Sequence, residues 1–130
     1  MLKWIISEQL AGNHRPGYAA HSVRQDEVDA YIGELRQHGI KSIICLLADD
    51  QLAYYAALPD GLVAYYRSAG FQVEHIPATD YQCPPLTDAQ LDKVWVAYQK
   101  RPKPVLVHCS AGCDRTGAAV EYIQRQTAFS

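Results

Sequence analysis

The chain has 130 residues, of which 48% are hydrophobic and 20% charged, and its formal net charge is −2. This size and composition fit one globular domain and exclude an intrinsically disordered chain, because enough apolar surface can be buried to offset the entropy of ordering. No apolar run approaches the roughly 20 residues of a membrane span. The absence of a basic field argues against a nucleic-acid partner. We therefore expect a single domain over residues 1–130.

The cysteines and the N-terminus indicate a reducing compartment. The apolar run within residues 1–6 is too short for a signal peptide, and an acidic residue follows it. The four cysteines lack the paired CxxC spacing of a structural zinc site. We expect a cytoplasmic protein with free thiols and with no metal or cofactor.

Taken in chain order, the hydrophobic pattern alternates between strands and helices. Apolar or alternating runs predict strands over 3–6, 8–11, 41–47, 71–76 and 104–108. Helical spacing predicts helices from a Ser22 cap to Gly39, over 51–57 and 62–69, after a Thr87 cap, and from Arg115 onward. This alternation is typical of an α/β fold with a mostly parallel central sheet and helices on both faces.

In such a sheet, ligands bind at the carboxyl ends of the strands. The loops that follow Leu47, Ile76 and His108 should therefore lie on one rim. The third of these loops carries the strongest signal in the chain, since residues 108–117 read HCSAGCDRTG.

This loop has the parts of an anion site. Backbone amides between a buried strand and a helix N-terminus can form a nest for three oxygens, and an arginine can hold two of them. Gly112 permits a backbone conformation that a side chain resists. We expect phosphate to bind to Ser110, Ala111, Gly112, Cys113, Asp114 and Arg115.

The same positive environment should stabilise a thiolate on Cys109, which makes it a candidate nucleophile. Thr116 is expected to donate a hydrogen bond to that sulfur, and His108 to support the loop. A plain buried core thiol is the commoner fate of a cysteine. That alternative does not explain an arginine six residues later in a strand–loop–helix context.

Cysteine, five residues, then Arg-Thr, after a hydrophobic strand and a histidine, resembles the signature of the cysteine-based protein tyrosine phosphatase superfamily, in its dual-specificity-like form. The resemblance implies that fold and a phosphomonoester hydrolase with a phosphocysteine intermediate. Low-molecular-weight phosphatases have a similar loop, but at their N-terminus. The substrate would be phosphotyrosine, with phosphoserine and phosphothreonine as further substrates, on proteins.

Members of this superfamily keep an aspartate upstream of the cysteine, often as Asp-x-x-x-Pro, to give the leaving group a proton. Asp80, followed by Pro84 and 29 residues before Cys109, matches. Its alternative is a turn aspartate. Asp88 is a rival, although it suits a helix start. Asp114 is a second rival, inside the loop.

Other functions stay open. A phosphoinositide or other small-molecule phosphatase is the first alternative, because Asp-Arg-Thr also occurs in such enzymes, although the loop lacks their lysine. An inactive phosphate-binding module and a sulfurtransferase are remote alternatives. Some relatives protect the nucleophile in a disulfide, for which Cys45 is the favoured partner and Cys113 a second one. Residues 15–17, Arg-Pro-Gly, could approach the pocket, but we expect a plain turn.

Only 15 residues follow Arg115, enough for one helix. By resemblance, the usual further C-terminal helices are lacking. We therefore expect a minimal form of the fold or a homodimer in which a second copy supplies the missing cover.

Overall fold

A computed structural model describes residues 2–129, so the two ends of the predicted domain, residues 1 and 130, lie outside the described residues. A five-stranded sheet runs through its centre in the order β1-β2-β5-β3-β4. The β1–β2 pair is antiparallel and the other three pairs are parallel. The strands are β1 (Lys3–Ile6), β2 (Leu10–Asn13), β3 (Ser42–Cys45), β4 (Gln72–His75) and β5 (Val105–His108).

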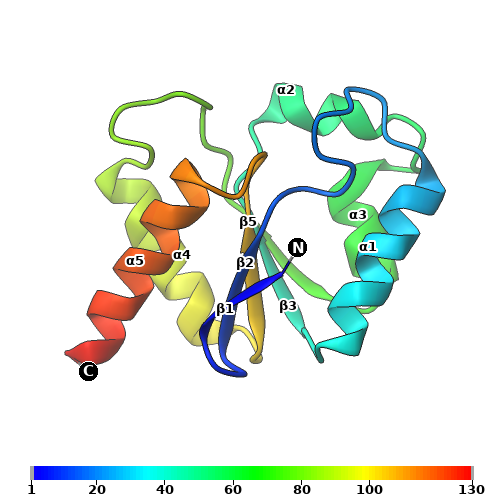
Figure 1. The fold of residues 1–130 in the computed structure, drawn as a ribbon. Helices are drawn as coiled ribbons and strands as arrows, with labels where there is room; N and C mark the ends of the chain where they lie inside the picture. The colour runs from blue at the N-terminus through cyan, green and yellow to red at the C-terminus, as the bar shows by residue number, and fades with distance from the viewer. Residues whose placement is uncertain (1, 130) are drawn as a thin grey trace.

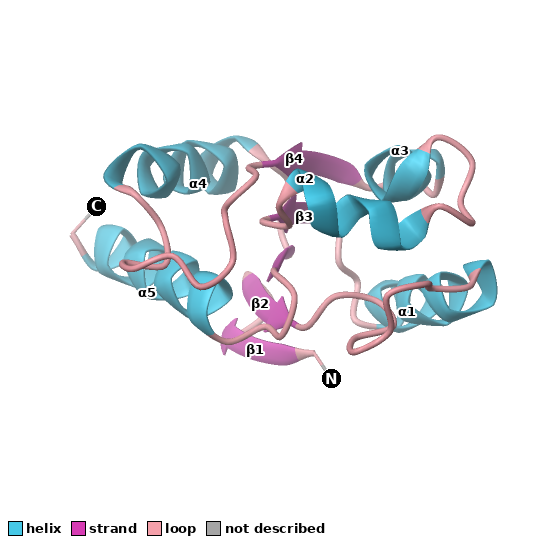
Figure 2. Ribbon diagram, turned by 90° about the horizontal axis from the view of Figure 1, so that it is seen from above, coloured by secondary structure: helices cyan, strands magenta, loops and turns pink. Residues whose placement is uncertain are grey.

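Helices cover both faces of this sheet, which confirms the predicted α/β class (Figure 1). Seen from above, α4 and α5 lie on one side of the strands, whereas α1, α2 and α3 lie on the other (Figure 2). The helices are α1 (Gln25–Gln37), α2 (Asp49–Leu52), the 3-10 turn η1 (Ala53–Tyr55), α3 (Gly61–Ser68), α4 (Asp88–Lys100) and α5 (Asp114–Ala128).

The two central strands, β3 and β5, are buried over their whole length. Their sequences are continuous apolar runs, as expected for parallel strands covered on both faces. Successive side chains alternate between two clusters: Leu106 packs toward α1 and α3, while Val105 and Val107 pack toward α4 and α5. The sheet is thereby held rigid directly beneath its carboxyl rim.

Two predicted helix starts differ from the structure. Helix α1 is capped by Arg24 rather than Ser22, because the Glu27 carboxylate accepts a hydrogen bond from the Arg24 amide at 3.2 Å. The segment predicted as a helix over 51–57 begins earlier, at Asp49, and tightens into η1. The Thr87 cap of α4 is confirmed, with Thr87 Oγ1 accepting from the Gln90 amide at 3.1 Å.

A histidine lies fully buried at the end of β5. The Nδ1 atom of His108 is 3.1 Å from the Cys109 carbonyl oxygen, and its Nε2 is 3.0 Å from the Tyr66 hydroxyl. Since a carbonyl only accepts, Nδ1 carries the proton and Nε2 accepts from Tyr66. Burial lowers the pKa of His108 to about 4, so the ring is neutral near pH 7.

This histidine should make the fold sensitive to acid. The folded pKa lies below the ordinary value of 6.5, so the stability contributed by the neutral ring is complete above pH 6.5 and is lost as the pH falls towards 4. The loss expected from this group alone is roughly 3 kcal/mol. Urea unfolding between pH 7 and pH 4 measures it. The His108→Gln variant should lose less stability over this window than the wild type, and an identical loss in both proteins would refute the assignment.

Candidate active site

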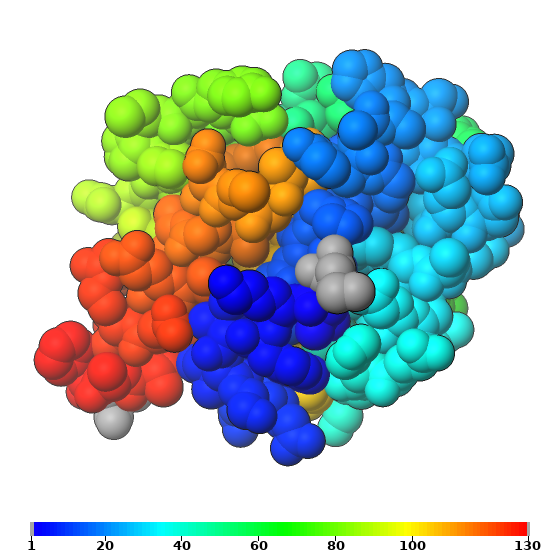
Figure 3. All heavy atoms as spheres, viewed as in Figure 1, coloured from blue at the N-terminus to red at the C-terminus, as the bar shows by residue number. Residues whose placement is uncertain are grey.

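The predicted meeting of three loops at one rim is confirmed by the contacts of a single side chain. Arg115, in the first turn of α5, donates from Nη1 to the carbonyl oxygens of Leu46 at 3.2 Å and Ala78 at 2.9 Å. These residues follow β3 and β4, respectively. In Figure 3 the orange start of α5 adjoins the light-green segment near residue 80 above it and the blue loop after β2 beside it.

An acidic side chain shares this contact. Asp80 Oδ2 lies 3.2 Å from Arg115 Nη2, an ion pair without good hydrogen-bond alignment. Gln51 orients both partners, since its Oε1 accepts from Arg115 Nη1 at 2.8 Å and its Nε2 donates to Asp80 Oδ2 at 3.1 Å. The amide of Tyr81 donates to Asp80 Oδ1 at 3.0 Å. The carboxylate is thus fixed in place and faces the arginine.

The loop between β5 and α5 curls around a buried sulfur. Cys109 is only 2% exposed, and the Gly112 amide donates to its Sγ at 3.3 Å. Gly112 has φ +77°, and a Cβ there would stand 2.7 Å from backbone atoms of Asn13 and His14. The close approach of this loop to the end of β2 therefore requires glycine.

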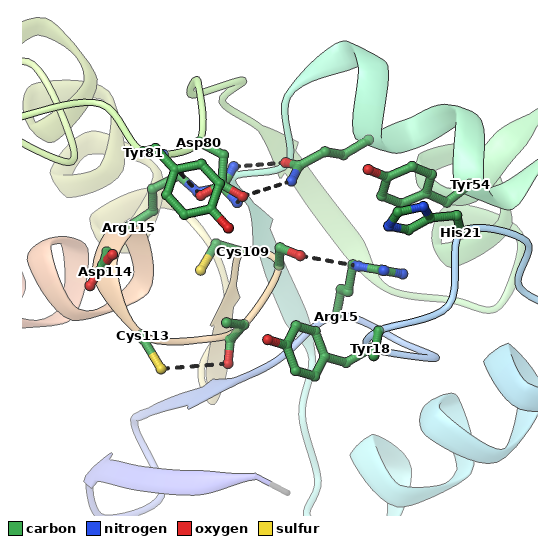
Figure 4. A pocket seen from close by; sticks show the side chains of 14 residues that line it. Arg15, Tyr18, His21, Tyr54, Asp80, Tyr81, Cys109, Cys113, Asp114 and Arg115 are labelled. Atoms are coloured by element: carbon green, nitrogen blue, oxygen red, sulfur yellow. Dashed lines mark hydrogen bonds and ion pairs between the residues drawn. The ribbon is translucent and has the colours of Figure 1, made fainter.

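These groups open onto one cavity of about 410 Å³ (Figure 4). Residues 109–115 all line it except Gly112, and Asp80, Tyr81 and Gln51 complete one wall. Of the rival acids, Asp114 lines the cavity as an exposed residue. Asp88 begins α4 and is not among the described residues that line it.

Thr116 does not make the hydrogen bond expected of it. The residue is buried, yet its Oγ1 has no hydrogen-bond partner among residues 2–129. It lines a different hollow, beside Gly12 and Val120, rather than the cavity that contains Cys109. The support expected from His108 takes the form of its hydrogen bond to the Cys109 carbonyl.

Cys45 and Cys109 are both free thiols in this structure. Cys45 packs in the cluster beneath α1 and α3, whereas Cys109 packs in the cluster beneath α4 and α5. Burial raises the pKa of Cys45 to about 12, so its thiol stays protonated. Cys113 is exposed, and its Sγ lies 3.8 Å from the Ala111 carbonyl oxygen.

A second arginine enters the cavity from a segment expected to form a plain turn. The backbone does turn after Arg15, but the side chain is only 2% exposed and lines the same cavity. Its Nε donates to Ser110 Oγ at 3.2 Å, and its amide donates to the Ser110 carbonyl at 2.9 Å. The sequence did contain a signal that Arg15 could enter the cavity, since Arg15 follows a strand whose carboxyl end reaches the same rim. Gln51, in the short helix α2 that follows β3, was missed although the same reasoning applies.

Within residues 2–129, no three His, Cys, Asp or Glu side chains cluster so that they could hold a metal ion. In the same range, no helix combines the length and the apolar character needed to cross a bilayer.

Several solved structures share this fold. Tk-PTP superimposes with a TM-score of 0.71 at 21% identity, covering 98% of this chain and 73% of that one. A putative phosphatase (DUF442) from Shewanella putrefaciens CN-32 gives 0.70 at 22% identity, covering 99% and 73%. The core catalytic domain of the PP-IP phosphatase SIW14 from S. cerevisiae gives 0.62 at 18% identity, covering 99% and 67%. At these identities, the likeness establishes the fold alone.

Sequence comparison establishes the family. No curated protein gives a significant match. The family model described as "Polymorphic toxin system, DSP-PTPase phosphatase" matches residues 17–127, which is most of the chain and includes the loop around Cys109. The chain therefore belongs to this DSP-PTPase phosphatase family, within the cysteine-based protein tyrosine phosphatase superfamily.

Proposed function

We propose that this chain hydrolyses phosphomonoesters with the Cys109 thiolate as nucleophile, Arg115 as phosphate ligand and Asp80 as general acid and base. The observation that carries the proposal is that Cys109, Asp80 and Arg115 line one cavity. Backbone amides of the loop and the first turn of α5 provide the donors that phosphate oxygens need. Because these groups supply the positive charge, the proposed chemistry needs no metal or cofactor.

In the first step, the Cys109 sulfur attacks phosphorus and the bond to the ester oxygen breaks. The leaving oxygen takes a proton from Asp80. Bound phosphate replaces Asp80 as the anion on Arg115, so the carboxyl group can turn to the leaving oxygen. Loop amides and Arg115 stabilise the equatorial oxygens during transfer.

In the second step, water attacks the phosphocysteine and the S–P bond breaks. Asp80, now a carboxylate, takes a proton from the water, and the thiolate is restored. The Gly112 amide, which donates to Cys109 Sγ at 3.3 Å, supports the sulfur as a leaving group. A reducing compartment such as the cytoplasm is part of this proposal, because a disulfide at Cys109 would stop the reaction.

One candidate substrate class is phosphotyrosine in proteins, together with phosphoserine and phosphothreonine. The tyrosine rings that line the cavity support an aromatic leaving group, and Tyr81, beside Asp80, is 92% exposed. Small phosphorylated molecules, including phosphoinositides, are the second candidate. Arg15 favours them, because it adds a second cation to the cavity. The loop over residues 109–115 contains no lysine that could do so.

Replacing the nucleophile tests the reaction. Cys109→Ser should abolish turnover of p-nitrophenyl phosphate, because a serine hydroxyl has no stabilised anionic form here, while inorganic phosphate should still raise the melting temperature. Wild-type turnover should persist in chelator and be blocked by vanadate. Substantial turnover by Cys109→Ser would refute the proposal.

Replacing the acid tests its assignment. Asp80→Asn should lower kcat by about 100-fold or more, since general acid–base catalysis contributes roughly 10²–10⁴-fold, with a smaller change in phosphate affinity. Asp88→Asn is the matched control and should leave kcat within about twofold of the wild type. The reverse pattern would assign the acid to Asp88.

The nest of amides can be tested through its glycine. Gly112→Ala should weaken inhibition by inorganic phosphate at least about tenfold, because the new Cβ would collide with the end of β2 at a positive φ. Gly117→Ala, in the same helix-loop segment but with open space at its Cβ position, is the control and should change inhibition by less than about threefold. Equal effects would show that the close approach to β2 is unimportant.

A further inference from the structure

Arg15 is a buried cation that has no anionic partner among the residues that the structure describes. Its guanidinium donates to uncharged oxygens: Ser110 Oγ at 3.2 Å, the Tyr55 hydroxyl at 3.3 Å, the Ala20 carbonyl at 2.7 Å and, at 3.5 Å, two further carbonyls. Its carbon centre lies 4.7 Å from the centroid of the Tyr54 ring. Among residues 2–129, no carboxylate forms an ion pair with it.

Such an arrangement is costly unless an anion arrives. Taking a charge out of water is unfavourable, and neutral hydrogen bonds and a ring face offset that desolvation cost only in part. The other buried arginine of the cavity, Arg115, already has Asp80 as its anion. The cavity therefore contains two buried cations but only one carboxylate paired with either of them.

The position of Arg15 separates it from the phosphate ligand. In Figure 4, Arg15, Tyr18, His21 and Tyr54 lie on one side of Cys109, while Asp80, Asp114 and Arg115 lie on the other. An anion on the Asp114 side would meet a carboxylate, whereas one on the Arg15 side would not. The two sides of the cavity thus differ in charge, and only the Arg15 side lacks an acid.

Arg15 also has donors to offer. Nη2 carries two N–H groups, and only the Ala20 carbonyl accepts from this atom among the described residues. Ser110 accepts from Arg15 through its hydroxyl oxygen and can donate its own O–H to a bound anion. Both donors belong to residues that line the cavity.

We propose that the preferred substrate is a small molecule carrying a second phosphoryl group, which binds on the Arg15 side while Cys109 attacks the first. This proposal rests on the proposed function and assigns Arg15 as a specificity-determining residue. Because Arg15 is only 2% exposed, an anion reaches it only from inside the cavity. A carboxylate flanking a phosphorylated residue of a folded protein would stay outside.

Two pairs of probes test the preference. Inorganic pyrophosphate should inhibit p-nitrophenyl phosphate turnover at least about tenfold more strongly than inorganic phosphate, since a hydrogen bond between charged groups is worth about that factor. Likewise, 2,3-bisphosphoglycerate should have a kcat/KM at least about tenfold above that of 3-phosphoglycerate and above that of a phosphotyrosine peptide. Phosphonoacetate, with a carboxylate in place of the second phosphoryl group, should fall between phosphate and pyrophosphate.

Variants assign the preference to Arg15. Arg15→Gln should reduce the ratio of the phosphate and pyrophosphate inhibition constants to about threefold or less, and Arg15→Lys should keep part of it. Arg125→Gln is the matched control: it removes one charge from an exposed pair with Glu121, and the ratio should not change. Competitive inhibition constants do not depend on the active fraction, so partial unfolding of a variant does not distort them.

Equal inhibition of the wild type by phosphate and pyrophosphate would overturn the proposal. The proposal would also be overturned if Arg15→Gln left the ratio of the two inhibition constants unchanged, or if a phosphotyrosine peptide were the best substrate. If the protein hydrolyses p-nitrophenyl phosphate and Cys109→Ser abolishes this, such a result refutes the second-anion site alone. If there is no turnover at all, the proposed function fails instead. The two anions can then be compared by the rise in melting temperature that each produces, where no preference for pyrophosphate again overturns the proposal.

Discussion

The site depends on the contacts that the buried guanidinium of Arg115 makes. One nitrogen ties together the loops after β3 and β4 through two carbonyl oxygens, and the other faces the Asp80 carboxylate. A guanidinium without these acceptors would be a costly buried charge. The same contacts that satisfy the arginine therefore bring three loops, far apart in sequence, to one cavity.

This arrangement links folding to chemistry. Arg115 lies in the first turn of α5, directly after the proposed phosphate-binding loop, and Gly112 of that loop lies against the end of β2. In the proposed mechanism, bound phosphate takes the place of the Asp80 carboxylate as the anion that pairs with Arg115. The rigid central strands β3 and β5 hold these loops in register while the exchange takes place.

The local pattern of the sequence alone predicted much of the fold and part of the candidate site. The alternation of strands and helices gave the parallel sheet, and the spacing of Cys109 and Arg115 gave the loop, because both depend on neighbours in the chain. For residues 15–17 a plain turn was expected rather than an approach to the pocket, and Gln51 was not considered, since the contacts of both side chains depend on segments that are distant in sequence. The expected bond from Thr116 to the sulfur is absent: Oγ1 has no hydrogen-bond partner among the described residues, and the methyl carbon of Thr116 lies beside Gly12.

The most direct test of the central claim is to trap the intermediate. Rapid mixing with p-nitrophenyl phosphate, followed by quenching and peptide mass spectrometry, should find one phosphoryl group on the peptide that contains Cys109. The modified fraction should increase in Asp80→Asn if loss of the base slows hydrolysis of phosphocysteine more than its formation. Turnover with no phosphorylated Cys109 at any mixing time, or a phosphoryl group on another residue, would contradict the account.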